Sequence, residues 1–127
     1  MKRDMDLVRK ILFKIEEEVD NKPKFDLTID EYTMDQVAYH CSILYDGGYI
    51  KNYKSLGCGE GLVSFGVSGL TWSGHELLDK ISNENVWNKT KQVVKNKGLP
   101  MVVDVIKDIA TAIITSMTQA AIQEFTK

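Results

Sequence analysis

The chain has few of the residues that point to a disulfide scaffold or a metal centre. Only two cysteines, Cys41 and Cys58, occur among its 127 residues, too few for a disulfide framework. Together with His40 and His75 they are the soft metal-ligand types present, and none of their spacings matches a structural zinc site. We therefore expect neither a disulfide network nor a bound metal.

Catalytic and phosphate-binding patterns are also missing. The glycine-rich run at residues 57–61 reads GCGEG, but it lacks the lysine and the Ser/Thr of a phosphate-binding loop. The acidic run Glu16, Glu17 and Glu18 has the composition of a solvated helix face. The sequence predicts a protein that is not an enzyme and that uses no cofactor.

Basic charge is not in excess, and no uninterrupted apolar run reaches membrane length. The formal net charge is −2, whereas a protein that grips the phosphate backbone usually has a basic excess or a basic face. The most apolar stretch, residues 102–122, is interrupted by Lys107 and Asp108, so we expect no membrane span. Asp4 and Asp6 interrupt the opening of the chain where a secretory signal would be apolar. A cytoplasmic location is the resulting expectation.

What the chain does contain is a well-defined helical pattern in residues 32–50, YTMDQVAYHCSILYDGGYI. At 100° per residue, apolar residues gather on one side, polar residues fall opposite, and His40 lies on the border. Gly47 and Gly48 suit the left-handed conformation that ends a helix, and Tyr49 and Ile50 are typical of a strand start. The apolar sector contains Met34, Val37, Ala38, Cys41, Leu44 and Tyr45, and the opposite face contains Asp35, Gln36, Tyr39, Ser42, Ile43 and Asp46.

Other elements precede and follow this helix. Helices are predicted where apolar residues recur at helical spacing, and strands where they alternate with polar residues. Thr71 is a good N-cap, and the glycines at residues 57–61 suit a hairpin tip. The predicted elements are helices at about residues 4–19, 34–46, 71–81, 85–96 and 101–125, a strand at 25–29 and a hairpin at 51–69.

This order of elements resembles that of the winged-helix transcription regulators over roughly the first two-thirds of the chain. The resemblance is carried by His40, Cys41, Leu44, Gly48, Tyr49 and Ile50, then by Leu70, Thr71 and Gly74. The segments MKRDMDLVRKIL, AYHCSILYDGGYI, LTWSGHELLDKI and VWNKTK are also similar to a family of small bacterial and phage proteins known as domain of unknown function 2513. The resemblance implies an α+β fold, with a winged-helix-like domain over residues 1–82, a small β-hairpin wing and a C-terminal helical extension over residues 83–127.

The winged-helix resemblance implies a DNA-binding or transcription-regulatory protein of prophage type, with double-stranded DNA as its partner. The residues expected to face a groove are Gln36, Tyr39, His40 and Ser42, and those expected to meet the DNA backbone are Lys51, Tyr53 and Lys54. Two features argue against this role. Only residues 30–33 separate the predicted strand from the helix at Met34, too few for the first helix of a helix-turn-helix pair. That helix also has no Lys or Arg up to Asp46. The alternative is a protein-interaction module that keeps the scaffold and has lost DNA binding.

The C-terminal helix has a broad apolar sector that a small winged-helix core does not need. It either folds back on its own domain or pairs with its twin in a homodimer. The residues at the centre of this sector, and so of the expected dimer interface, are Val102, Val105, Ile106, Ile109, Ile113 and Met117.

Overall fold

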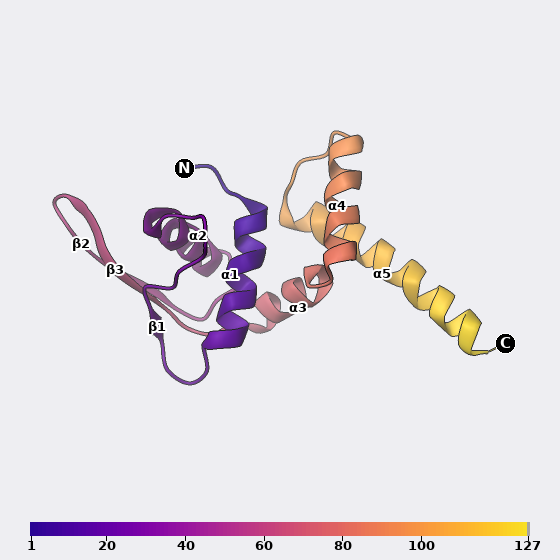
Figure 1. Ribbon diagram of the computed structural model, residues 1–127, viewed down its shortest axis with the longest axis horizontal. Coiled ribbons are helices and arrows are strands. Elements are labelled where there is room, and N and C mark those ends of the chain that lie inside the picture. Colours follow the sequence, from indigo (N-terminus) through magenta and orange to yellow (C-terminus); the bar gives the residue numbers. More distant parts are fainter. Residues whose placement is uncertain (127) are drawn as a thin grey trace. The chain divides into compact units, whose positions relative to one another are not determined.

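A computed structural model describes residues 1–126 of the chain, apart from the side chain of Cys58. Within them the chain forms helices and one antiparallel sheet, which confirms the predicted α+β class (Figure 1). It divides into two compact units, Met1–Leu78 and a second that begins at Asp79, whereas the sequence placed its boundary at residue 82. The elements are α1 (Met5–Glu18), β1 (Lys24–Phe25), α2 (Met34–Asp46), β2 (Tyr53–Cys58), β3 (Gly61–Val67), α3 (Trp72–Ile81), α4 (Glu84–Asn96) and α5 (Val103–Phe125).

Helix α1 supplies much of the core of the first unit. Asp4 is its N-cap, because Oδ1 of Asp4 accepts hydrogen bonds from the backbone N–H groups of Asp6 (2.9 Å) and Leu7 (3.2 Å). One stripe of the helix is buried and the other faces are solvated. Each fully buried leucine or isoleucine contributes about 1.5 to 3 kcal/mol to folding, and the stripe contains Leu7, Val8, Ile11, Leu12 and Ile15.

Helix α2 begins and ends where its sequence predicts. A capping box closes its start, since Thr33 Oγ1 accepts the Gln36 N–H and Gln36 Oε1 accepts the Thr33 N–H. Gly48 has a φ of 81°, the left-handed conformation expected after the helix. The predicted strand start at Ile50 is reduced to an isolated bridge with Leu70, because β2 begins only at Tyr53.

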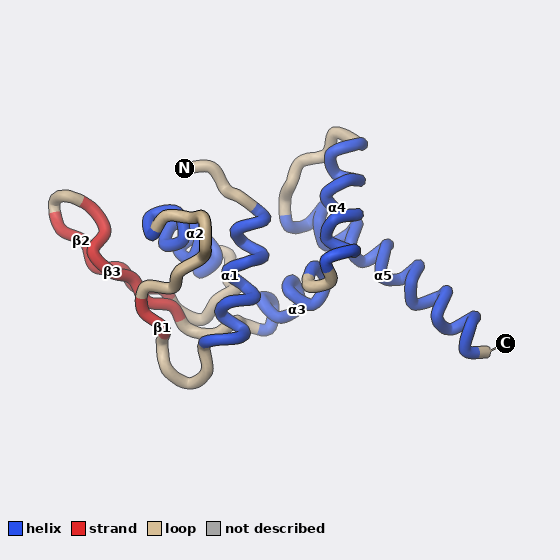
Figure 2. The backbone as a smooth tube through the Cα atoms, viewed as in Figure 1, coloured by secondary structure: helices blue, strands red, loops and turns tan. Residues whose placement is uncertain are grey.

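The segment between β1 and α2 contains no helix of its own (Figure 2). Its only regular feature is a turn in which the Tyr32 N–H donates to the Ile29 carbonyl oxygen at 3.2 Å. The prediction of a strand through Ile29 was wrong, since β1 ends at Phe25. The cause is Asp26, which turns the chain with a φ of 54° while its Oδ1 accepts the Phe65 N–H.

The three strands form an antiparallel sheet in the order β1-β3-β2. Strands β2 and β3 are joined at Gly59 and Glu60, so the predicted glycine-rich hairpin tip is confirmed. The register shifts between Leu56 and Gly57, and such a bulge bends the strand and increases its twist. The hairpin extends past α2, so its tip is separate from the core of the first unit (Figure 1).

The start of α3 lies against the end of the loop after α2. Thr71 Oγ1 accepts the Gly74 N–H at 3.1 Å, which confirms the predicted N-cap. Gly74 packs directly against the backbone at Tyr49. A Cβ at position 74 would overlap the Tyr49 carbonyl oxygen. Only glycine therefore allows the first turn of α3 to approach the backbone at Tyr49 this closely.

In the second unit, α4 packs against the N-terminal half of α5. Asn83 is the N-cap of α4, and its side chain accepts the Val86 N–H at 3.1 Å. Lys80 Nζ also donates to Thr111 Oγ1 at 2.9 Å. The buried residues of the two helices are Val86, Trp87, Thr90 and Val94 on α4 and Ile106 and Ala110 on α5.

Candidate binding surfaces

The exposed face of α2 does not present the four side chains predicted to face a groove. His40 is only 2% exposed, so its placement toward DNA was wrong. Its Nε2 accepts the backbone N–H of Asp4 at 2.8 Å and its Nδ1 lies 2.7 Å from the Gln36 carbonyl oxygen. This arrangement assigns the hydrogen to Nδ1, because an acceptor is required at Nε2. His40 therefore fastens α2 to the start of α1.

The other three predicted groove residues are partly committed to the helix itself. Gln36 is half-buried and its side chain closes the capping box with Thr33. Ser42 Oγ donates to the Tyr39 carbonyl oxygen at 2.7 Å, and the Tyr39 ring is exposed. The same helix exposes the carboxylates of Asp35 and Asp46, which repel phosphate.

Tyr32 connects the turn before α2 to α1. Its hydroxyl donates to Asp4 Oδ2 at 3.2 Å, and Lys10 Nζ lies 5.4 Å from the centre of its ring. Burial, together with the negative charge of Asp4, raises the pKa of the Tyr32 hydroxyl above its ordinary value. Asp4 thus receives hydrogen bonds from Tyr32 as well as from α1, which makes it the junction of three segments.

The residues predicted to contact the DNA backbone do not form one surface, because Lys51 precedes β2 and Tyr53 and Lys54 lie on opposite sides of the sheet. Lys51 and Lys54 are exposed, but Tyr53 is half-buried, with its ring centre 6.2 Å from that of Phe65. Tyr53 pairs with Val67, whose side chain is buried, so its ring lies on the side of the sheet that faces the core. Burial there raises the pKa of the Tyr53 hydroxyl, although a hydrogen bond with Ser55 lowers it in part. Lys54 points the other way, because successive strand residues alternate between faces.

We call this other side the outer sheet face, formed by Phe25, Lys54, Leu56, Ser64 and Gly66. The Phe25 ring covers Gly66, since a Cβ on Gly66 would lie 2.9 Å from Phe25 Cε1. Phe25 is nevertheless 64% exposed and Leu56 is 65% exposed. Two hollows of about 190 and 200 Å³ flank Phe25, and Lys54 borders both. The face therefore combines exposed apolar side chains with the positive charge of Lys54, and its Ser64 hydroxyl donates to Asp26 Oδ1 at 2.9 Å.

Sequence reasoning missed the outer sheet face. Lys54 and Leu56 are two residues apart, so a strand places both on the same face. Phe25 joins them only through the pairing of β1 with β3. That pairing ends at Asp26, which no local pattern indicated. The small residue at Gly66 was the one available signal, because a strand glycine often marks a close approach by another group.

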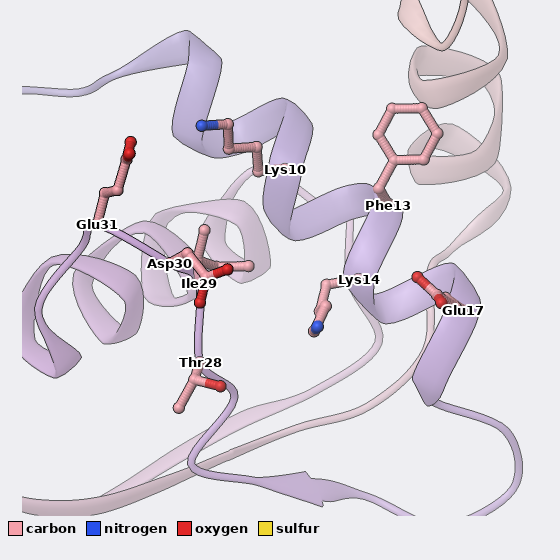
Figure 3. A pocket seen from close by; sticks show the side chains of 8 residues that line it. All are labelled: Lys10, Phe13, Lys14, Glu17, Thr28, Ile29, Asp30 and Glu31. Carbon is pink, nitrogen blue, oxygen red and sulfur yellow. The ribbon is translucent and has the colours of Figure 1, made fainter.

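A larger hollow of about 430 Å³ lies between α1 and residues 28–31 (Figure 3). It is lined by side chains of both charge signs, among them Lys10, Lys14 and Glu17 from α1 and Asp30 from the loop. Lys14 Nζ lies 3.5 Å from Glu18 Oε1, so Lys14 has an ion-pair partner within its own helix. The mixed lining favours neither anions nor cations. The hollow lies beside the turn at residues 29–32, which stands where a helix-turn-helix protein would have its first helix.

Helix α5 is buried only near its start. Ile106 is fully buried in the second unit, so its assignment to a dimer interface was wrong. Val102, Val105, Ile109 and Ile113 are half-buried, and residues 115–126 are all exposed, including Met117 at 48% and Phe125 at 90%. By length and composition alone, α5 is the one helix in the described part of the chain that is long and apolar enough to cross a membrane.

Taken together, the fold and these surfaces define a small α+β protein with an acidic helix face and an exposed apolar sheet face. The chain belongs to the family described as "Hypothetical protein (DUF2513)", whose family model matches residues 2–100. An "Uncharacterized protein" of Haemophilus influenzae is 40% identical over 122 residues, which cover 92% of this chain and 98% of the relative. No solved structure matches the chain.

Proposed function

We propose that the chain is a non-catalytic binding protein that contacts another protein through the outer sheet face. The observation that carries the proposal is the exposure of Phe25 and Leu56 around Lys54 on one side of a short sheet. Large apolar side chains exposed together in this way are typical of interaction sites. The winged-helix-like order of elements serves here as a rigid support for that face.

The lining of the two hollows defines the chemistry of the partner. Each hollow is large enough to hold an apolar side chain, and Phe25 lines both of them. The ammonium group of Lys54 borders both hollows and favours a carboxylate between the two apolar groups. The expected ligand is a protein segment with two apolar residues and an Asp or Glu near them.

The charge distribution supports protein binding over DNA binding. Residues 1–78 carry nine Lys or Arg and thirteen Asp or Glu. Of the side chains predicted to read bases, His40 is buried and Gln36 caps its own helix. Affinity for DNA rests mainly on phosphate contacts by Lys and Arg, and the exposed face of α2 offers none.

A displayed library of random peptides, selected against the full chain, tests the protein-binding proposal. The selected peptides should combine two apolar residues with an acidic one. Their dissociation constants should rise about tenfold or more in Leu56→Ser and Lys54→Glu variants. Val63→Ser is the matched control, because Val63 is 55% exposed on the same hairpin but borders neither hollow. Peptides that bind all the variants equally well would contradict the proposal.

DNA binding is the second candidate, favoured by the exposure of both Lys51 and Lys54 near the base of the hairpin. Binding to mixed-sequence duplex DNA over a salt series distinguishes the two functions. The protein-binding proposal expects no steep salt dependence and no difference between the wild type and a Lys51→Ala/Lys54→Ala variant. Micromolar affinity that falls steeply with salt and weakens in this variant would establish phosphate contact instead.

A further inference from the structure

The C-terminal part of α5 continues the packing face of the helix beyond the end of its partner. Helix α4 has 13 residues and α5 has 23, which at 1.5 Å per residue correspond to about 20 and 35 Å. Ile106 and Ala110 are fully buried against the second unit's own core. From residue 115 onward every described side chain is exposed. We call residues 114–125 the overhang.

The overhang keeps the same apolar stripe that α5 uses at its start. At 100° per residue, Ile114, Met117, Ala121 and Phe125 fall on one side, in line with Ala110. Thr115, Gln119 and Gln123 fall on the opposite side. Met117 is 48% exposed and Phe125 is 90% exposed, so the stripe is continuous with a packed interface but is not covered by other described residues of the second unit.

We infer that the overhangs of two copies of this chain pack against each other as antiparallel helices. Pairing about residue 119 places Met117 of one copy opposite Ala121 of the other, so that a long side chain meets a small one. The same register brings Ile114 and Phe125 together at each end, because both lie on the same edge of the stripe. Because a twofold axis relates the copies, each contact is made twice.

Charge favours the antiparallel arrangement. Residues 109–123 contain no charged side chain, and Glu124 is the single charge in the overhang. Parallel helices would place Glu124 beside Glu124 of the second copy, whereas antiparallel helices place the two carboxylates at opposite ends. At 100° per residue Glu124 falls on the stripe itself, at its C-terminal end, where the carboxylate is exposed to water. The rest of the stripe, from Ile114 to Ala121, contains no charged side chain, so its burial against a second copy leaves no unpaired charge.

The length of the overhang argues against a lipid bilayer as the occupant. Twelve helical residues span about 18 Å, and the hydrocarbon core is about 30 Å thick. Crossing a membrane would require α5 to leave α4 and to expose Val86, Trp87 and Val94, which are buried in the second unit. A second copy requires no such change.

Sedimentation equilibrium of the full chain tests this inference. The wild type should dimerise reversibly, with a dissociation constant of about 10 to 100 µM because the interface is small. Met117→Glu, which places a carboxylate in the stripe, should raise that constant about tenfold or more. Gln119→Glu is the matched control, since it adds the same charge two residues away on the polar side and should leave the constant unchanged.

A covalent test fixes the register. In a Cys58→Ser background, a Met117→Cys/Ala121→Cys variant oxidised in air should form dimers whose disulfides join position 117 of one copy to position 121 of the other. A wild type that stays monomeric at 500 µM, equal effects of the two glutamate substitutions, or links from 117 to 117 would each overturn the inference. So would a monomer that binds phosphatidylglycerol vesicles through the overhang.

Discussion

Asp4 and His40 join two parts of the first unit that are 36 residues apart in the sequence. The Asp4 side chain starts α1, its backbone N–H donates to His40 Nε2, and its second carboxylate oxygen accepts the Tyr32 hydroxyl. The helical wheel placed His40 on the border between the two faces of α2. Whether a residue on that border is buried or exposed depends on where α1 packs against α2, and no local sequence pattern contains that information.

Cys41, next to His40, makes the stability of the fold depend on pH. Burial raises the pKa of its thiol from 9.0 to about 12. Above pH 9 the unfolded chain releases a proton that the native state retains, so the free energy of unfolding falls as pH rises toward 12. Between pH 9 and 11 the wild type should lose about 2 to 3 kcal/mol more than a Cys41→Ala variant.

Urea unfolding at each pH measures this difference. Comparing the two proteins cancels the tyrosine and lysine titrations that they share. Curves of unfolding free energy against pH that run parallel from pH 9 to 11 would show that the Cys41 thiol ionises as easily in the native state as in the unfolded chain.

At the scale of elements, helix ends were easier to predict than strand ends. Thr33, Thr71 and Gly48 fix helix boundaries through hydrogen bonds and backbone angles within a few residues. β1 depends on contacts of Asp26 with Phe65, 39 residues away. The outer sheet face depends on the same pairing. The helices were therefore predictable, whereas the candidate site on the outer sheet face required the register of all three strands.

The capping box of α2 gives a prediction at this scale. Thr33→Ala removes the acceptor of the Gln36 N–H, and the reciprocal bond from Gln36 then loses its support. The free energy of unfolding should fall by about 1 kcal/mol, measured by urea unfolding at pH 7. Thr28→Ala, at an exposed threonine of the preceding loop, should change it by less than about 0.5 kcal/mol. Equal losses in the two variants would mean that the cap does not stabilise α2.

At the scale of the whole molecule, charge and exposure are unevenly distributed. Residues 1–78 have an acidic excess of four, whereas residues 79–127 carry seven Lys and five Asp or Glu. The bulk charge of −2 concealed this difference. The length of α5 was predicted almost correctly, but the sequence could not show where α4 stops covering it, because that point depends on how the two helices align.

Removing residues 117–127 should therefore leave the monomer nearly as stable as before. At 1 µM protein the thermal midpoint should change by less than about 3 °C, since the deleted side chains that the structure describes are all exposed. Ile106→Ala, which removes a fully buried side chain, should lower the midpoint by about 8 °C or more. Circular dichroism melts compare the two. A large drop for the truncated chain would mean that the deleted residues belong to the monomer's core.

The approach of Gly74 to Tyr49 has a consequence for evolution. A side chain at position 74 would collide with the backbone at Tyr49. Because the clash is with backbone, no substitution elsewhere can relieve it unless α3 moves. Thr71 caps the same turn and bonds to the Gly48 carbonyl oxygen. Descendants of this fold should retain the pair Thr-x-x-Gly even after the surrounding sequence has diverged. The spacing is thus a signature by which distant relatives can be recognised when overall identity has become too low to detect.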